Sequence, residues 1–73
     1  MNFKLKFAII RSGKNQIEIA REAEIQESKL SKIVNGYVQP TEEEMSRIAK
    51  VLEIPKRELF NINDQNELVK AGF

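Results

Sequence analysis

Residues 26–36, QESKLSKIVNG, combine residue types and a spacing that could recognise a polar ligand. The apolar residues Leu30, Ile33 and Val34 recur at the spacing of one buried helical stripe. The opposite edge carries a carboxylate, a hydroxyl and an ammonium group, on Glu27, Ser28 and Lys32. Such a face can donate and accept hydrogen bonds, so the question is whether it reads a ligand or is only solvated.

Catalysis is not expected. The chain has no histidine and no cysteine, so the usual general bases, nucleophiles and metal ligands are absent. No glycine-rich loop is present to cradle a phosphate, and the run at residues 42–44 is typical of a solvated first helical turn. We therefore expect neither an enzyme nor a bound cofactor or metal.

The composition is typical of one small globular domain. The chain has 73 residues, of which 41% are hydrophobic and 32% charged. Nothing resembles a signal peptide, and the apolar run 7–10 is too short to span a membrane, so a cytoplasmic protein is expected. The net charge is only +1. Residues 1–38 nevertheless carry +3 and residues 39–73 carry −2, so a polyanion would sit on the first half.

The apolar spacing predicts five helices, at residues 2–12, 16–23, 27–34, 41–52 and 55–60. In the first, Phe3, Leu5, Phe7 and Ile9 also alternate as in a strand. Helix is favoured, because a lone strand in a helical chain has no partner.

Local signals mark the helix ends. Asn15 is a suitable N-cap, and Thr41 with Glu44 forms a capping box. Gly36 suits the left-handed residue after a helix, and Pro55 suits the first position of the last helix. Only residues 24–26 separate the second and third helices. So short a turn predicts two helices that cross steeply, as in a helix-turn-helix.

The segment NQIEIAREAEIQESKLSKIVNGYVQPTEEEMSRIAKVLEIPKRELF resembles the Cro and phage-repressor type (XRE) helix-turn-helix family, from about residue 5 to residue 60. The matching marks are Gln16, Ala20, Ile25, Ser28, Ile33, Asn35, Gly36, Pro40 and the segment RIAKVLEIPKRELF. The resemblance implies an all-α, five-helix, lambda-repressor-like domain over residues 1–60, with the helix-turn-helix at about 16–34. Residues 61–73 would be a tail, either disordered or a docking arm.

Packing explains why several of these residues have the types that they have. The small Ala20 lets the two helices of the motif approach, and Ile25 buries the turn. Leu30 and Ile33 anchor the third helix, which leaves its N-terminal face free to enter a DNA major groove. The resemblance implies a sequence-specific regulator of double-stranded DNA, a repressor that binds a two-fold operator as a homodimer through residues 27–34.

The resemblance places Glu27, Ser28 and Lys32 at base edges. Glu27 departs from the family, which often has glutamine there. Its carboxylate is repelled by phosphate but can accept from cytosine N4, or it simply favours its helix dipole. Lys32 can donate to guanine O6 and N7, to phosphate or to solvent.

Contacts with the DNA backbone are also implied. Gln16 begins a helix, where an anion is attracted, although it could instead cap its own helix. Lys29 suits a phosphate or plain solvent, and Asn35 fits both a backbone contact and a helix end. The other implied edge contacts are Lys14, Gln26 and Tyr37.

The chain departs from the family at three further positions. Glu24 and Glu53 stand where members often have glycine, and Lys14 stands where they have an apolar residue. A non-glycine residue held left-handed costs on the order of 1 kcal/mol. The two turns therefore either differ from the family or carry strain.

The dimer surface is left open among the helix at 55–60, the tail and an outer apolar row of Phe3, Phe7 and Ile10. A competing function is a protein-interaction module of the same fold. Such a module, for example the antitoxin of a toxin–antitoxin pair, would bind a protein partner through the tail.

Overall fold

The computed structural model describes residues 1–60, and the tail expected at 61–73 lies outside them. The described residues form helices and connections without a strand, so the all-α expectation is confirmed. The helices are α1 (Phe3–Ser12), α2 (Gln16–Ala23), α3 (Glu27–Val34), α4 (Glu42–Leu52) and α5 (Lys56–Leu59).

These bounds agree with the sequence predictions to within one residue. Residues 3–9 are helical, so the period-two alternation there does not mark a strand. The ends that differ do so by one residue: Asn2, Thr41 and Pro55 are N-caps and Phe60 is a C-cap, so these four residues lie just outside their helices. For Pro55 the sequence had predicted the first helical position. Its ψ of 140° is extended, which keeps it outside the helix while its fixed φ of −56° still leads into the first turn.

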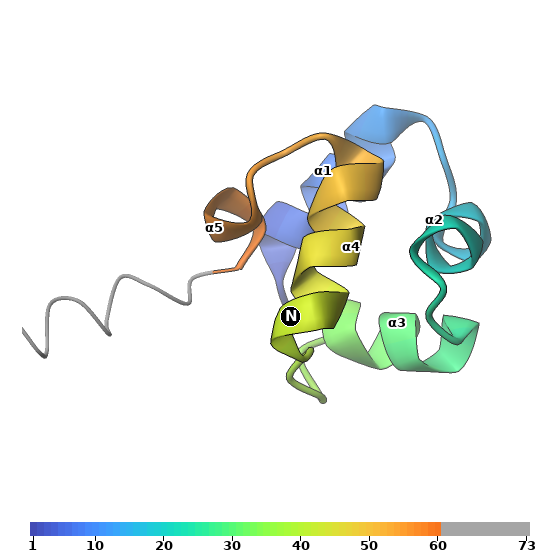
Figure 1. The fold of residues 1–73 in the computed structure, drawn as a ribbon, viewed down its shortest axis with the longest axis vertical. Coiled ribbons are helices and arrows are strands. Elements are labelled where there is room, and N and C mark those ends of the chain that lie inside the picture. The colour runs from blue at the N-terminus through green and yellow to red at the C-terminus, as the bar shows by residue number, and fades with distance from the viewer. Residues whose placement is uncertain (61–73) are drawn as a thin grey trace, which may run out of the picture.

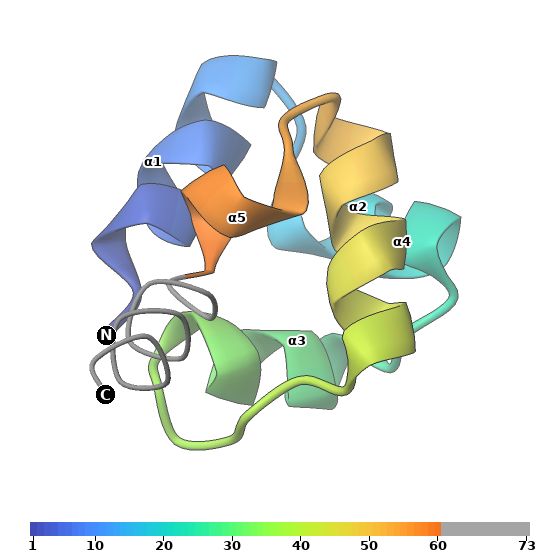
Figure 2. The same ribbon diagram turned by 60° about the vertical axis from the view of Figure 1, so that its left-hand side comes forward.

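The helices pack around one core. In Figures 1 and 2, α3 lies across the lower end of the molecule while α4 stands upright above it. The short α5 packs against both α1 and α4 (Figure 2). Each helix contributes at least one side chain that is almost completely inaccessible: Leu5, Ile19, Leu30 and Val34, Ile48 and Leu59. The proposed recognition helix, α3, is therefore held in place through its buried face, which packs on the core.

Three helices end in the same hydrogen-bonded turn. After α2, the amide of Ile25 donates to the carbonyl of Ala20 at 2.9 Å, and Glu24 has a φ of 60°. After α4, the amide of Ile54 donates to Ala49 at 3.1 Å, and Glu53 has a φ of 59°. This is the Schellman pattern, which needs a left-handed residue. Both glutamates therefore hold the strained backbone that the family gives to glycine.

Gly36 occupies the equivalent left-handed position after α3, with a φ of 83°. The amide of Tyr37 closes that turn on the carbonyl of Lys32 at 2.8 Å. A Cβ atom on Gly36 would also lie 3.1 Å from the backbone nitrogen of Met1. Glycine is therefore required here for both its conformation and its small size.

Replacing Glu53 by glycine should raise the free energy of unfolding by about 0.5–1 kcal/mol. Relief of the left-handed strain contributes about 1–2 kcal/mol, partly offset by the greater freedom of glycine in the unfolded chain. Urea denaturation measures the change. Glu53→Ala is the matched control, because alanine retains the strain. An equal gain in both variants would contradict the strain argument.

Asn2 joins three helices at the N-terminus. Its side-chain oxygen accepts from the amide of Leu5 at 3.0 Å and so caps α1. Its side-chain nitrogen donates to the carbonyl of Leu59 at 2.9 Å, at the end of α5. Its backbone amide donates to the carbonyl of Val34 at 2.9 Å. The C-terminal end of α3 is thereby tied to α1 and α5.

Candidate nucleic-acid interface

The α2–turn–α3 unit has the geometry expected of a helix-turn-helix. Ala20 is 3% exposed on α2, which packs against both α3 and α4, so a larger side chain there would push the packed helices apart. Ile25 is 8% exposed and closes the turn over the core. The three-residue connection therefore sets how α3 is presented to solvent.

The third helix is divided sharply into two faces. Leu30, Ile33 and Val34 are each at most 2% exposed. Glu27, Ser28 and Lys32 are exposed, as the sequence predicted for a recognition face. Because α3 lies along the lower rim of the molecule (Figures 1 and 2), this face is not covered by another described helix.

The first turn of α3 has no side-chain cap. Gln26 is its N-cap residue, but its side chain accepts no hydrogen bond from the helix. The first amides of a helix have no partner inside the helix. At α3 these amides therefore point along the helix axis, with the positive end of the helix dipole, out of the N-terminal end of the helix.

The N-terminus of α2 is organised differently. Asn15 accepts from the amide of Glu18 at 2.8 Å, and the Glu18 carboxylate accepts from the amide of Asn15 at 2.9 Å. Gln16 is the first helical residue and is half-buried, so it is not the cap of its own helix. A reciprocal capping box satisfies two amides and places a carboxylate beside this helix end.

Lys29 extends to α4 instead of to open solvent. Its ammonium nitrogen lies 2.7 Å from a carboxylate oxygen of Glu44, whose side chain is only 15% exposed. The other Glu44 oxygen accepts from the amide of Thr41 at 2.9 Å, within the expected capping box. Glu44 therefore caps α4 and ties it to the recognition helix at the same time.

The run at residues 42–44 is more than a solvated first turn. Glu42 pairs with Lys56 of α5, and Glu43 pairs with Arg47 one turn further along α4. With the Glu44 pair, each carboxylate of the run has a cation partner. The run thus connects α4 to both α3 and α5.

The predicted edge contacts lie in three different environments. The ammonium of Lys14 lies 2.7 Å from the Glu22 carboxylate, and this hydrogen bond raises the pKa of Lys14. Tyr37 follows α3 and is 80% exposed. Asn35 is half-buried at the C-cap of α3, and Gln26 is exposed at the opposite end.

One residue beside the recognition face was not singled out from the sequence. Ser31 lies one turn after Ser28 on α3 and is partly exposed. Residues three apart are neighbours on a helix surface. The spacing itself could have identified Ser31 as a second hydroxyl beside Lys32.

The capping and pairing of Glu44 make stability depend on pH. The hydrogen bond from Lys29, followed by that from Thr41, lowers the pKa of Glu44 below its ordinary 4.5. A lowered folded-state pKa stabilises the fold above the ordinary pKa, and this contribution is lost as pH falls through the folded value.

We expect the stability difference between the wild type and Glu44→Gln to shrink as pH falls from about 6 to about 3. Urea denaturation across that range measures it. Glu27→Gln removes an exposed carboxylate from α3 without touching the Lys29 pair and is the matched control. A difference that stays constant with pH would show that the carboxylate charge of Glu44 is irrelevant.

Other kinds of site find little support within residues 1–60. No cluster of three or more potential metal ligands occurs among them. Of the five described helices, none has the length and apolar character that crossing a membrane requires.

Comparison with known proteins identifies the domain. No curated protein and no solved structure matches the chain. The model of one family, described as helix-turn-helix, matches residues 5–59, which is most of the chain. The match spans the α2–turn–α3 unit and the core that holds it. The chain belongs to the Cro-type (XRE) helix-turn-helix family of DNA-binding regulators.

Proposed function

We propose that the protein is a sequence-specific repressor that binds a two-fold DNA operator as a homodimer, with α3 in the major groove. The observation that carries the proposal is the division of α3 into a buried apolar face and an exposed polar face. A major groove admits one helix and presents a distinct pattern of donors and acceptors for each base pair.

Three side chains would read base edges. Lys32 donates to guanine O6 or N7, and Ser28 can donate or accept. Glu27 accepts from cytosine N4, the pairing open to a carboxylate in this groove. Ser31 lies beside this set and is a fourth candidate.

Contacts with phosphates would fix the register of α3. Neutral donors would come from Gln16, Asn35, Gln26 and Tyr37. To contact a phosphate, Lys14 and Lys29 must each give up the ion pair with a glutamate carboxylate. A partly exposed ion pair contributes only about 0–1 kcal/mol. The exchange therefore costs little, and both lysines remain candidates for phosphate contacts.

Dimerisation follows from the size of the recognition helix. An eight-residue helix reaches few base pairs, and two half-sites roughly 34 Å apart would supply the missing affinity and specificity. We propose a cytoplasmic protein that occupies such paired sites and represses by occupying them.

An electrophoretic shift on random-sequence duplex DNA across a salt series tests the proposal. The binding constant should fall linearly with the logarithm of salt concentration, because phosphate contacts release counterions. In vitro selection would then give the preferred site, its symmetry and its half-site spacing. Absence of duplex binding at low salt and micromolar protein would rule the proposal out.

The competing function is a protein-interaction module of the same fold, such as an antitoxin. It is favoured by the exposed apolar row of Phe3, Phe7 and Ile10 on α1 and by the net charge of only +1. The salt series distinguishes the two, because a module that binds only protein would show no salt-dependent affinity for duplex DNA.

A further inference from the structure

The outer face of α1 carries three large apolar side chains that the core does not use. Phe3, Phe7 and Ile10 are each 61–62% exposed. Their i, i+4, i+7 spacing aligns them along one side of the helix. The buried residues of α1 are Leu5, Ala8 and Ile9, on the opposite side. We call the exposed set the α1 row.

The charges that α1 itself places beside the α1 row are all positive, whereas α5 adds one carboxylate, Glu58, which lines a hollow together with Phe7 and Arg11. Lys4, Lys6 and Arg11 flank it, and α1 contains no acidic residue. A second copy packed across a two-fold axis would bring the same surface against itself. Like charges at the edges of two packed helices oppose their association, so the α1 row favours an acidic occupant over its own copy.

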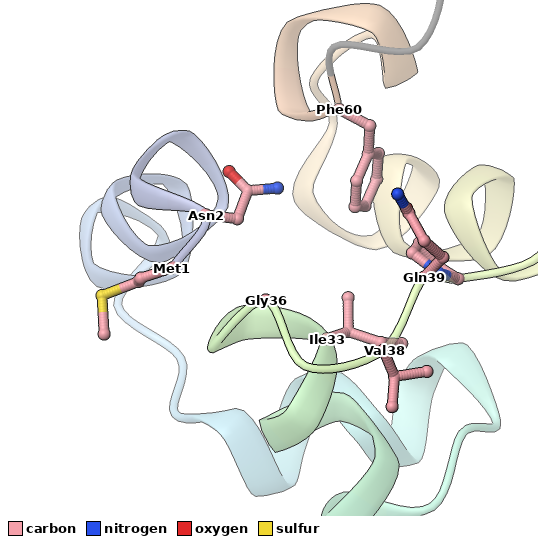
Figure 3. A pocket seen from close by; sticks show the side chains of 8 residues that line it. Met1, Asn2, Ile33, Gly36, Val38, Gln39 and Phe60 are labelled. Atoms are coloured by element: carbon pink, nitrogen blue, oxygen red, sulfur yellow. The ribbon is translucent and has the colours of Figure 1, made fainter.

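An acidic and apolar segment begins close to this row. The described chain ends at Phe60, and the preceding carbonyl, of Leu59, accepts the hydrogen bond from Asn2 at the start of α1. Asn2 and Phe60 both line a small pocket of about 260 Å³ (Figure 3). The last described residues of the chain, Leu59 and Phe60, therefore lie beside the start of α1.

The composition of residues 61–73 matches the α1 row. They contain Asp64 and Glu67, which can pair with Lys6 and Arg11. They also contain four large apolar residues: Ile62, Leu68, Val69 and Phe73. The single Lys70 leaves the segment with more acidic than basic side chains.

The segment is also long enough. At 1.5 Å per residue, the ten residues of α1 span about 15 Å. Thirteen residues span roughly 20 Å as a helix and about 43 Å when extended. Either form can run the full length of the α1 row from a start beside Asn2.

We propose that residues 61–73 of the same chain cover the α1 row, with their apolar side chains on Phe3, Phe7 and Ile10 and their carboxylates on Lys6 and Arg11. This interaction is independent of DNA binding by α3. It removes three large apolar side chains from water and leaves α1 unavailable as a dimer surface.

The absence of cysteine allows a direct test in the full chain, because Asn66→Cys creates a single thiol for a nitroxide label. Paramagnetic relaxation should weaken the amide signals of α1 within the labelled molecule more strongly than those of the first turn of α3. A mixed sample, of nitroxide-labelled chain without ¹⁵N and ¹⁵N chain without nitroxide, should show no such loss. Loss in the mixed sample would overturn the proposal in favour of a second copy.

A second substitution ties the effect to the α1 row. Phe7→Ser on the labelled chain should restore the α1 signals, because it removes the central apolar contact. Ile17→Ser is the matched control, since Ile17 is another exposed apolar residue, 46% accessible on α2. Signals that are unaffected by the label in the parent chain, or equally weakened in Phe7→Ser, would also overturn the proposal.

Discussion

Replacing Leu30 by alanine is expected to lower the free energy of unfolding by about 2–5 kcal/mol. Leu30 is 0% exposed and lies on the buried face of α3. The substitution removes buried apolar atoms and leaves a cavity that the short helices can close only in part. The total free energy of unfolding of a small domain is only about 5–15 kcal/mol. In the variant, α3 should therefore become the least stable part of the fold.

Urea denaturation followed by circular dichroism measures the loss. Ile17→Ala is the control, because its side chain is 46% exposed and its truncation should cost much less. Hydrogen exchange at the α3 amides should quicken more than at α4 if the damage is local. A loss for Leu30→Ala no larger than for Ile17→Ala would contradict the anchoring role of Leu30.

Helix positions were predictable because their signals are local. Asn15 with Glu18 and Thr41 with Glu44 act within one helical turn. Gly36 acts through its own backbone angle. None of these signals requires knowledge of what packs against the helix, which explains why the sequence located each of the five starts to within one residue. At Pro55, a fixed φ suits both the N-cap and the first turn, so its type alone could not distinguish them.

The partners of the charged residues were not predictable for the opposite reason. Lys29 and Glu44 are fifteen positions apart, and only the packing of α3 near the start of α4 brings them to 2.7 Å. From the sequence, Lys29 appeared to have only phosphate or solvent as a partner. The structure adds a third partner, which changes what a Lys29 substitution would mean for DNA binding.

The recognition face lies between these two cases. Its exposure followed from the helical period, since Leu30, Ile33 and Val34 fix which side is buried. The residues beside the recognition face did not follow from the helical period. Ser31 was not predicted, because it belongs to neither the buried stripe nor the family's base-contacting positions. Periodicity therefore determines which face is presented, while the choice of bases depends on individual side chains.

That choice can be tested at Lys32. Lys32→Ala should weaken binding to the best selected site by about 1–3 kcal/mol and relax preference at one or two base pairs. Lys32 is exposed on the face of α3 opposite the core, so the substitution removes a donor to guanine without opening a cavity. Selection experiments on the variant, and titrations against single-base changes in the site, measure both effects.

Gln16→Ala is the informative comparison. Gln16 is at the start of α2, where a phosphate contact would support every sequence equally. Its loss should weaken all duplexes alike and leave the selected site unchanged. If Lys32→Ala behaves in the same way, then Lys32 binds phosphate. The sequence preference would then rest on Glu27 and Ser28, with cytosine N4 as the one base donor that the Glu27 carboxylate is expected to favour.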